Sequence, residues 1–118
     1  MTMPEFKQLV DEIKKEITEV SSDELQQMQQ AGEDFVLIDV REREDSSQGM
    51  IPGATALPRG VLELNIDQIT TDQEKTIVCY CGGGSRSALS AYMLQRMGFK
   101  NVKSLAGGYR GWKEKSGQ

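Results

Sequence analysis

The chain has 118 residues, a formal net charge of -4 and a hydrophobic fraction of 37%, which are the proportions of one small globular domain with a modest core. Its acidic balance, with a pI near 4.9, argues against nucleic acid as the main partner. The chain contains no histidine, which excludes Ser-His-Asp hydrolysis, Cys-His proteolysis and catalysis by a histidine-ligated metal.

The first predicted element is an amphipathic helix at the N-terminus. Apolar residues recur there every three to four positions, and Thr2 with Glu5 fits a capping box in front of them. A short strand is expected near residues 17–20. Ser21 then begins a second helix, which ends at Gly32. The apolar face of the first helix consists of Phe6, Leu9, Val10, Ile13 and Ile17.

The middle of the chain alternates short strands with short helices. Residues 35–38 form a continuous apolar run that is typical of a strand buried on both faces of a parallel sheet, and Asp39 closes it. The charged residues 41–48 predict a short helix or turn. Residues 54–57 predict a short strand, and residues 61–64 another short helix.

The last part of the chain continues this alternation. Residues 76–80 form a second buried strand, and a glycine-rich loop joins it to a long helix over residues 88–97. A short strand at residues 101–105 and a closing helix at residues 109–115 follow. Strands that alternate with helices indicate βαβ units, so we expect an α/β fold with a mostly parallel sheet.

The two cysteines, Cys79 and Cys81, are too few for the disulfide framework of a secreted domain. We expect both to be reduced and the protein to be cytoplasmic, because the sequence also shows no signal-peptide pattern and no apolar stretch that could span a membrane. Two thiols are also too few for a structural zinc site, so no metal or cofactor is expected. Cys79 lies inside the predicted strand and is interpreted as a buried core residue.

The glycine-rich loop carries the chemistry. Cys81 follows the buried strand directly, and Gly82, Gly83, Gly84 and then Arg86 lead into the helix. Consecutive glycines let the backbone bend tightly and turn several N–H groups inward, which makes an anion site at a helix N-terminus. Such surroundings lower the pKa of a thiol and favour the thiolate. The alternative interpretation is an ordinary glycine-rich turn with a buried cysteine.

The spacing within this loop separates two cysteine chemistries. A phosphatase-type phosphate cradle needs five residues between cysteine and arginine, but four separate Cys81 from Arg86 and six separate Cys79 from it. The shorter loop suits a smaller target such as sulfur. Basic residues are concentrated in the second half of the chain, where they form either an electropositive mouth for a small anion or ordinary solvated faces.

Four motifs in the correct order resemble the rhodanese homology domain, a sulfurtransferase family. Residues 37–42 resemble its first signature, and residues 49–54 its second, with Met50 where histidine is common. Residues 81–87 resemble the active-site pattern Cys-x-x-Gly-x-Arg-Ser, and residues 105–112 the closing Gly-Gly-x-x-x-Trp signature. The resemblance begins near residue 18, so we expect a helical extension over residues 1–16 and a rhodanese-like domain over residues 17–118.

The resemblance implies a five-stranded parallel sheet with helices on both faces. It also implies that Cys81 takes sulfane sulfur from thiosulfate or a persulfide donor and passes it to a thiol, to cyanide or to a protein acceptor. Glycines at positions 82–84 replace the cationic side chain of many thiosulfate-using members, which counts against thiosulfate as the physiological donor. The alternative within this fold is a non-catalytic persulfide carrier or interaction module.

Roles for the remaining site residues follow from the same resemblance. The loop amides would hold the negative persulfide, and Arg86 would brace the loop against an acidic residue. Arg41 would contact an anionic donor, and Asp39 would brace the site from a neighbouring strand end. Ser85 and Ser87 are alternatively interpreted as helix-start residues. The substrate-binding set is Gly82, Gly83, Gly84, Ser85, Arg86 and Arg41, with Asp39 and Ser87 as supporting residues.

Overall fold

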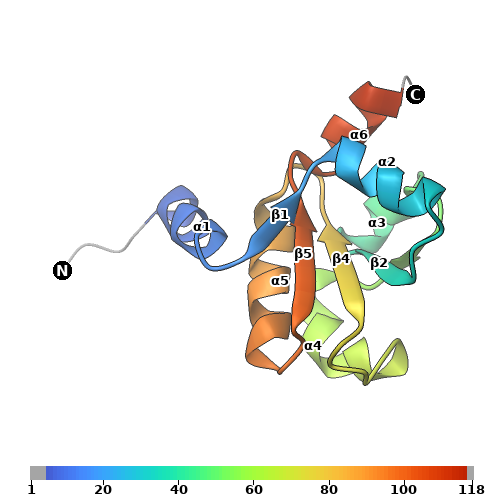
Figure 1. Cartoon of the computed structure of the whole chain (residues 1–118). Helices are drawn as coiled ribbons and strands as arrows, with labels where there is room; N and C mark the ends of the chain where they lie inside the picture. The colour runs from blue at the N-terminus through green and yellow to red at the C-terminus, as the bar shows by residue number, and fades with distance from the viewer. Residues whose placement is uncertain (1–4, 117–118) are drawn as a thin grey trace.

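A five-stranded parallel sheet lies between helices in the computed structural model, which describes residues 5–116 (Figure 1). The strand order is β1-β5-β4-β2-β3, and every neighbouring pair is parallel. The expected sheet is therefore confirmed. Its strands are β1 (Thr18–Val20), β2 (Phe35–Asp39), β3 (Ala54–Ala56), β4 (Thr76–Tyr80) and β5 (Asn101–Leu105).

Helices cover both faces of the sheet, as expected. One face packs on α4 and α5, where Leu62, Ala91 and Leu94 join a core with Cys79. The other face packs on α2 and α6, through residues such as Leu25 and Trp112. The helices are α1 (Phe6–Lys14), α2 (Ser22–Gln30), α3 (Arg43–Ser46), α4 (Leu62–Asn65), α5 (Ser85–Arg96) and α6 (Gly108–Ser116), with single 3-10 turns η1 (Arg59–Val61) and η2 (Ile66–Gln68) beside α4.

Strand β4 lies in the middle of the sheet and divides its side chains between the two cores. Ile77 and Cys79 point to the core beside α5, whereas Val78 and Tyr80 point to the core beside α6. This alternation follows from the two-residue period of a strand. It also places Cys81, the next residue, on the α5 side.

The N-terminal helix forms as expected, but its start differs from the prediction. It begins at Phe6 with Glu5 as its N-cap, and Glu5 forms the capping box with Gln8; Thr2 lies outside the described residues. Val10 is buried, but Phe6 and Leu9 are exposed. The expected apolar face is thus partly buried: Val10 and Ile17 pack inward, whereas the end that carries Phe6 and Leu9 is exposed, because α1 lies beyond the edge of the sheet and packs beside α5 (Figure 1).

The carboxyl ends of β2 and β4 are neighbours, since Asp39 pairs with Tyr80 in the ladder. The residues that follow them, Arg41 and Cys81, are thus brought to one edge of the sheet. Among residues 5–116, no helix has the length and apolarity needed to cross a membrane.

Candidate active site

The Cys81 sulfur lies inside the first turn of α5, surrounded by hydrogen-bond donors. The Gly84 amide donates to Sγ at 3.1 Å and the Ser87 amide at 3.4 Å, and the thiol donates to the Ser87 hydroxyl oxygen at 3.5 Å. When Cys81 is a thiolate, this hydroxyl becomes a third donor to the sulfur. The residue itself is only 2% exposed. A thiolate in this position exchanges water for donors that the fold holds in place.

Two opposing influences act on the pKa of Cys81. Burial is the largest and raises the pKa, since a charged sulfur loses its hydration. Hydrogen bonds from the Ser87 hydroxyl and amide, and from the Gly84 and Gly83 amides, lower the pKa. Their sum outweighs burial, so the pKa of Cys81 lies below that of an ordinary thiol. The site favours the reactive thiolate without an imidazole.

The loop takes this shape because the start of α6 holds its carbonyl groups. The Tyr109 amide donates to the Cys81 carbonyl at 2.7 Å, and the Arg110 amide donates to the Gly82 carbonyl at 3.1 Å. With these carbonyls tied to α6, the following amides are free to face the sulfur. Gly84 completes the turn with a φ of 106°, a conformation that favours glycine.

Ser87 is itself held by a residue that the sequence reasoning missed. Its hydroxyl lies 2.8 Å from the hydroxyl of Ser104 in β5, and both serines are fully buried. The contact positions the Ser87 oxygen beside Sγ, and with Ser104 as its donor it leaves the Ser87 proton free for the thiolate. A serine at an inward position of a buried strand was the available signal, since buried polar groups need partners.

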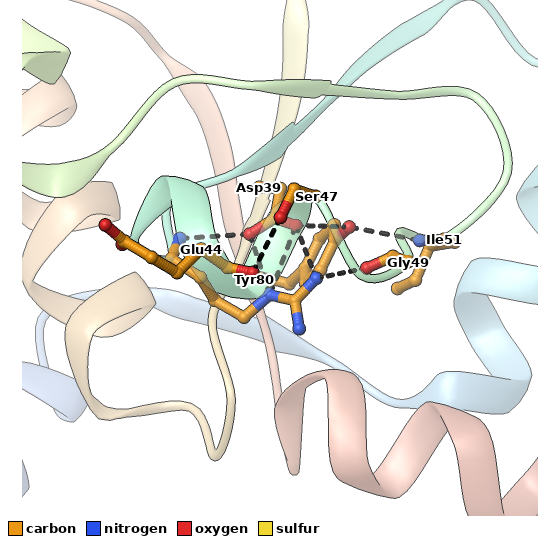
Figure 2. A network of polar contacts seen from close by, with 7 residues as sticks. Asp39, Glu44, Ser47, Gly49, Ile51 and Tyr80 are labelled. Atoms are coloured by element: carbon orange, nitrogen blue, oxygen red, sulfur yellow. Dashed lines mark hydrogen bonds and ion pairs between the residues drawn. The ribbon is translucent and has the colours of Figure 1, made fainter.

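A second polar network lies at the end of β2 (Figure 2). Nε and Nη2 of Arg41 donate to the fully buried Asp39 carboxylate at 2.8 to 3.1 Å. The Tyr80 hydroxyl donates to Asp39 at 3.0 Å and accepts from the Ile51 amide at 3.1 Å. Burial raises the pKa of Asp39, but the hydrogen bonds from Arg41 and Tyr80 outweigh it and lower the pKa.

Arg41 is largely occupied by this network. Its Nη2 also donates to the Gly49 carbonyl at 2.6 Å, and its guanidinium lies 4.1 Å from the centre of the Tyr109 ring. Arg41 is buried. Contact between Arg41 and an anionic donor would therefore have to use Nη1. Asp39 holds the Arg41 guanidinium in place, and its bracing role in the site stays a prediction.

The bracing role expected of Arg86 needs correction. Its side chain is 41% exposed and its Nη1 lies 3.9 Å from Oε1 of Glu42, and an ion pair of this kind contributes little. Arg110 holds the loop instead: its Nε donates to the Gly82 carbonyl at 3.3 Å. Its guanidinium also fills the space where a side chain at Gly83 would lie. Arg86 emerges from the first turn of α5, and only the folding of α6 onto the loop brings Arg110 there.

An open pocket of about 500 Å³ lies over the cysteine. Of the predicted site residues, Cys81, Gly82, Gly83, Ser85, Arg86 and Arg41 line it. Gly84 and Ser87 contact the sulfur through their amides, and Asp39 does not line the pocket but contacts Arg41, which does. The sequence reasoning did not assign four further lining residues to the site: Phe6, Asp45, Tyr109 and Arg110.

The second cysteine has the opposite environment. Cys79 is fully buried, and burial raises its pKa to about 12. The interpretation of Cys79 as a core residue is confirmed. Within the part of the chain that the structure describes, no three His, Cys, Asp or Glu side chains gather where they could hold a metal ion.

Comparison with known proteins finds one family. The sequence profile of the rhodanese-like domain matches residues 21–115. A sulfurtransferase of Allochromatium vinosum is 33% identical over 96 residues, which cover 81% of this chain and 88% of the relative. The thiosulfate sulfurtransferase GlpE of Pseudoalteromonas translucida is 36% identical over 80 residues, covering 68% of this chain and 74% of the relative.

A solved structure from Rhodopseudomonas palustris is similar over nearly the whole chain. Its TM-score is 0.85 at 34% identity, covering 98% of this chain and 94% of the other. That protein is described as one of unknown function and a "possible tyrosine phosphatase". The similarity extends beyond the family match and therefore includes helix α1.

Proposed function

The chain belongs to the rhodanese-like domain family, whose members include sulfurtransferases, and we propose that it transfers sulfane sulfur through a persulfide on Cys81. The observation that carries this proposal is the ring of donors around Sγ, which lowers the pKa of a nearly buried thiol. A thiolate that is both charged and next to an open pocket is the nucleophile that sulfur transfer needs.

The first step of the proposed reaction loads the cysteine. The Cys81 thiolate attacks the outer sulfur of the donor, a new S–S bond forms, and the donor's own bond to that sulfur breaks. The leaving group takes the electron pair; with thiosulfate it is sulfite. No proton is transferred when Cys81 begins as the thiolate. Amides of the loop 82–86 stabilise the negative charge of the persulfide, as an oxyanion hole does for oxygen.

The second step returns the enzyme to its starting state. An acceptor nucleophile, a thiolate or cyanide, attacks the outer sulfur of the persulfide, and Cys81 leaves as the thiolate. The donor is thiosulfate or a persulfide, and the acceptor is a thiol, cyanide or a protein thiol. The proposal keeps the cytoplasmic location expected from two free thiols. It also keeps the division into an extension (1–16) and a domain (17–118), with the family match inside the latter.

Intact mass spectrometry after incubation with thiosulfate or an organic persulfide tests the proposal. We expect the protein to gain the mass of one sulfur atom and to lose it when cyanide is added. Cys81→Ser should not gain this mass, whereas the matched variant Cys79→Ser should. If Cys79→Ser failed to gain the mass while Cys81→Ser still gained it, Cys79 rather than Cys81 would be the cysteine that carries the sulfur.

Two other outcomes would point to different functions. A stable persulfide with negligible turnover by cyanide or small thiols would indicate a sulfur carrier rather than an enzyme. Hydrolysis of a phosphate ester that depends on Cys81 would indicate phosphatase chemistry. The spacing from Cys81 to Arg86 speaks against phosphatase chemistry.

A further inference from the structure

Helix α1 brings an aromatic side chain to the pocket over Cys81. Phe6 lines that pocket together with the loop residues Gly82 and Gly83, although it lies far from them in the sequence. It is 56% exposed, so its ring is not part of the core. The packing of α1 beside α5 holds it there. An exposed aromatic ring at the edge of a reactive site offers apolar contact to whatever enters.

The pocket is larger than inorganic thiosulfate requires. Its volume of about 500 Å³ lies in the range of pockets that hold drug-sized organic ligands, roughly 300–1,000 Å³. Thiosulfate has five non-hydrogen atoms and would leave most of this space to water. An organic group attached to the transferable sulfur would fill it.

The walls of the pocket combine apolar and cationic character. Phe6 and Tyr109 provide aromatic surface, but Arg41 already covers the Tyr109 ring. Phe6 is thus the aromatic wall available to a ligand. Arg86 and Arg110 outnumber the single acidic lining residue, Asp45, so an anionic group next to the reacting sulfur is favoured.

We propose that Phe6 makes this pocket selective for organic sulfur donors, which carry an anionic group beside the sulfur and an apolar group of ring size, over thiosulfate. The inference rests on the proposed function. For a thiosulfonate donor, the Cys81 thiolate attacks the terminal sulfur and forms the S–S bond of the persulfide. The bond from that sulfur to the sulfonyl sulfur breaks, and a sulfinate leaves with the electron pair.

Steady-state kinetics with two donors and a common acceptor test the inference. Benzenethiosulfonate and thiosulfate are compared with cyanide as acceptor, and the readout is the ratio of their kcat/KM values. Because the two donors differ in intrinsic reactivity, the change in this ratio between variants is informative. We expect Phe6→Ala to lower the ratio of benzenethiosulfonate to thiosulfate by about five- to twentyfold, the effect of losing part of one aromatic contact.

Two variants serve as controls. Leu9 lies on the same helix, is 40% exposed and lines a different groove beside Tyr92. The variant Leu9→Ala should therefore leave the ratio of kcat/KM values unchanged. Phe6→Tyr preserves the ring and should retain the wild-type ratio within about twofold.

The outcomes separate the inference from the function on which it rests. An unchanged ratio in Phe6→Ala, or an equal fall in Leu9→Ala, would overturn the role of Phe6 while sulfur transfer stands. A wild-type protein that takes sulfur from neither donor would overturn the proposed function and the inference with it.

Discussion

Two cysteines, two residues apart on the same side of the sheet, have opposite acid–base properties. Both are almost inaccessible to solvent, and both lose hydration on folding. The pKa of Cys79 rises, whereas the pKa of Cys81 falls because amides and the Ser87 hydroxyl point at its sulfur. Burial alone therefore does not decide reactivity; the donors that replace water do.

Removing one of these donors should move the titration of Cys81. We expect Ser87→Ala to raise the pKa of Cys81 by about one unit, because a hydrogen bond to a charged group contributes roughly 1.5–3 kcal/mol and one unit corresponds to about 1.4 kcal/mol. Only the thiolate is alkylated, so the midpoint of the iodoacetamide rate against pH should shift upward.

Ser90→Ala is the matched control for this substitution. Ser90 is also a buried serine of α5, but its hydroxyl donates to the Arg86 carbonyl and not to the cysteine. Its pH midpoint should equal that of the wild-type protein. A midpoint in Ser87→Ala that stays in place or moves downward would show that this hydroxyl does not stabilise the thiolate.

The start of α6 shapes the loop that precedes α5, although the two segments are distant in the sequence. Gly108 begins α6 with a φ of 59° and lies directly against the Cys81 carbonyl and Gly82. A side chain there would collide with backbone atoms, which cannot move without displacing the loop. The close contact explains why a glycine stands at this position.

Two alanine substitutions in α6 should consequently have opposite effects. We expect Gly108→Ala to destabilise the protein by about 1–3 kcal/mol, because it adds both backbone strain and a collision. Gly111 has open space around it and no positive φ, so Gly111→Ala should stabilise by about 0.5–1 kcal/mol through helix propensity. Urea unfolding curves of the two variants and the wild type measure both values.

The rate at which Cys81 is loaded with sulfur provides a second measurement that distinguishes Gly108→Ala from Gly111→Ala. Gly108→Ala should also slow sulfur loading of Cys81, since the loop amides lose their alignment, whereas Gly111→Ala should not. Equal stability of the two variants would show that the contact between α6 and the loop is not tight.

The site lies at the topological switch point of the sheet, where the connections from two adjacent strands, β4 and β2, lead to opposite sides. From β4 the chain continues to β5 on one side, and from β2 it continues to β3 on the other. In open α/β sheets ligands bind in the crevice at the carboxyl ends of such a pair of strands. Cys81 follows β4 and the Asp39–Arg41 pair ends β2, so both networks face this crevice.

The same architecture protects Cys79 from reaction. Strand β4 lies between β5 and β2, and such a central strand opens only when the whole molecule unfolds. In the variant Cys81→Ser, the Cys79 thiol should react with a disulfide reagent only through the unfolded state. We therefore expect the logarithm of its reaction rate to rise with urea concentration with the same slope as the free energy of global unfolding falls. Rapid reaction without denaturant, or a rate independent of urea, would show that the strand opens locally.

Local patterns identified most of the elements. The apolar runs of β2 and β4 predicted buried strands, and Ser21 with Glu24 forms the capping box that starts α2. The order of cysteine, glycines and helix located the loop. These signals depend on residues near one another in the chain, and backbone propensity and period decide them.

The sequence by itself determined the fold class, the reactive cysteine as a candidate and the inert character of Cys79. Only the tertiary structure decided that Ser104 supports Ser87, that Arg110 rather than Arg86 holds the loop, and that the Phe6 ring faces the pocket. Each of these contacts joins residues from separate elements. Their meeting depends on how helices and strands pack, which spacing along the chain does not specify.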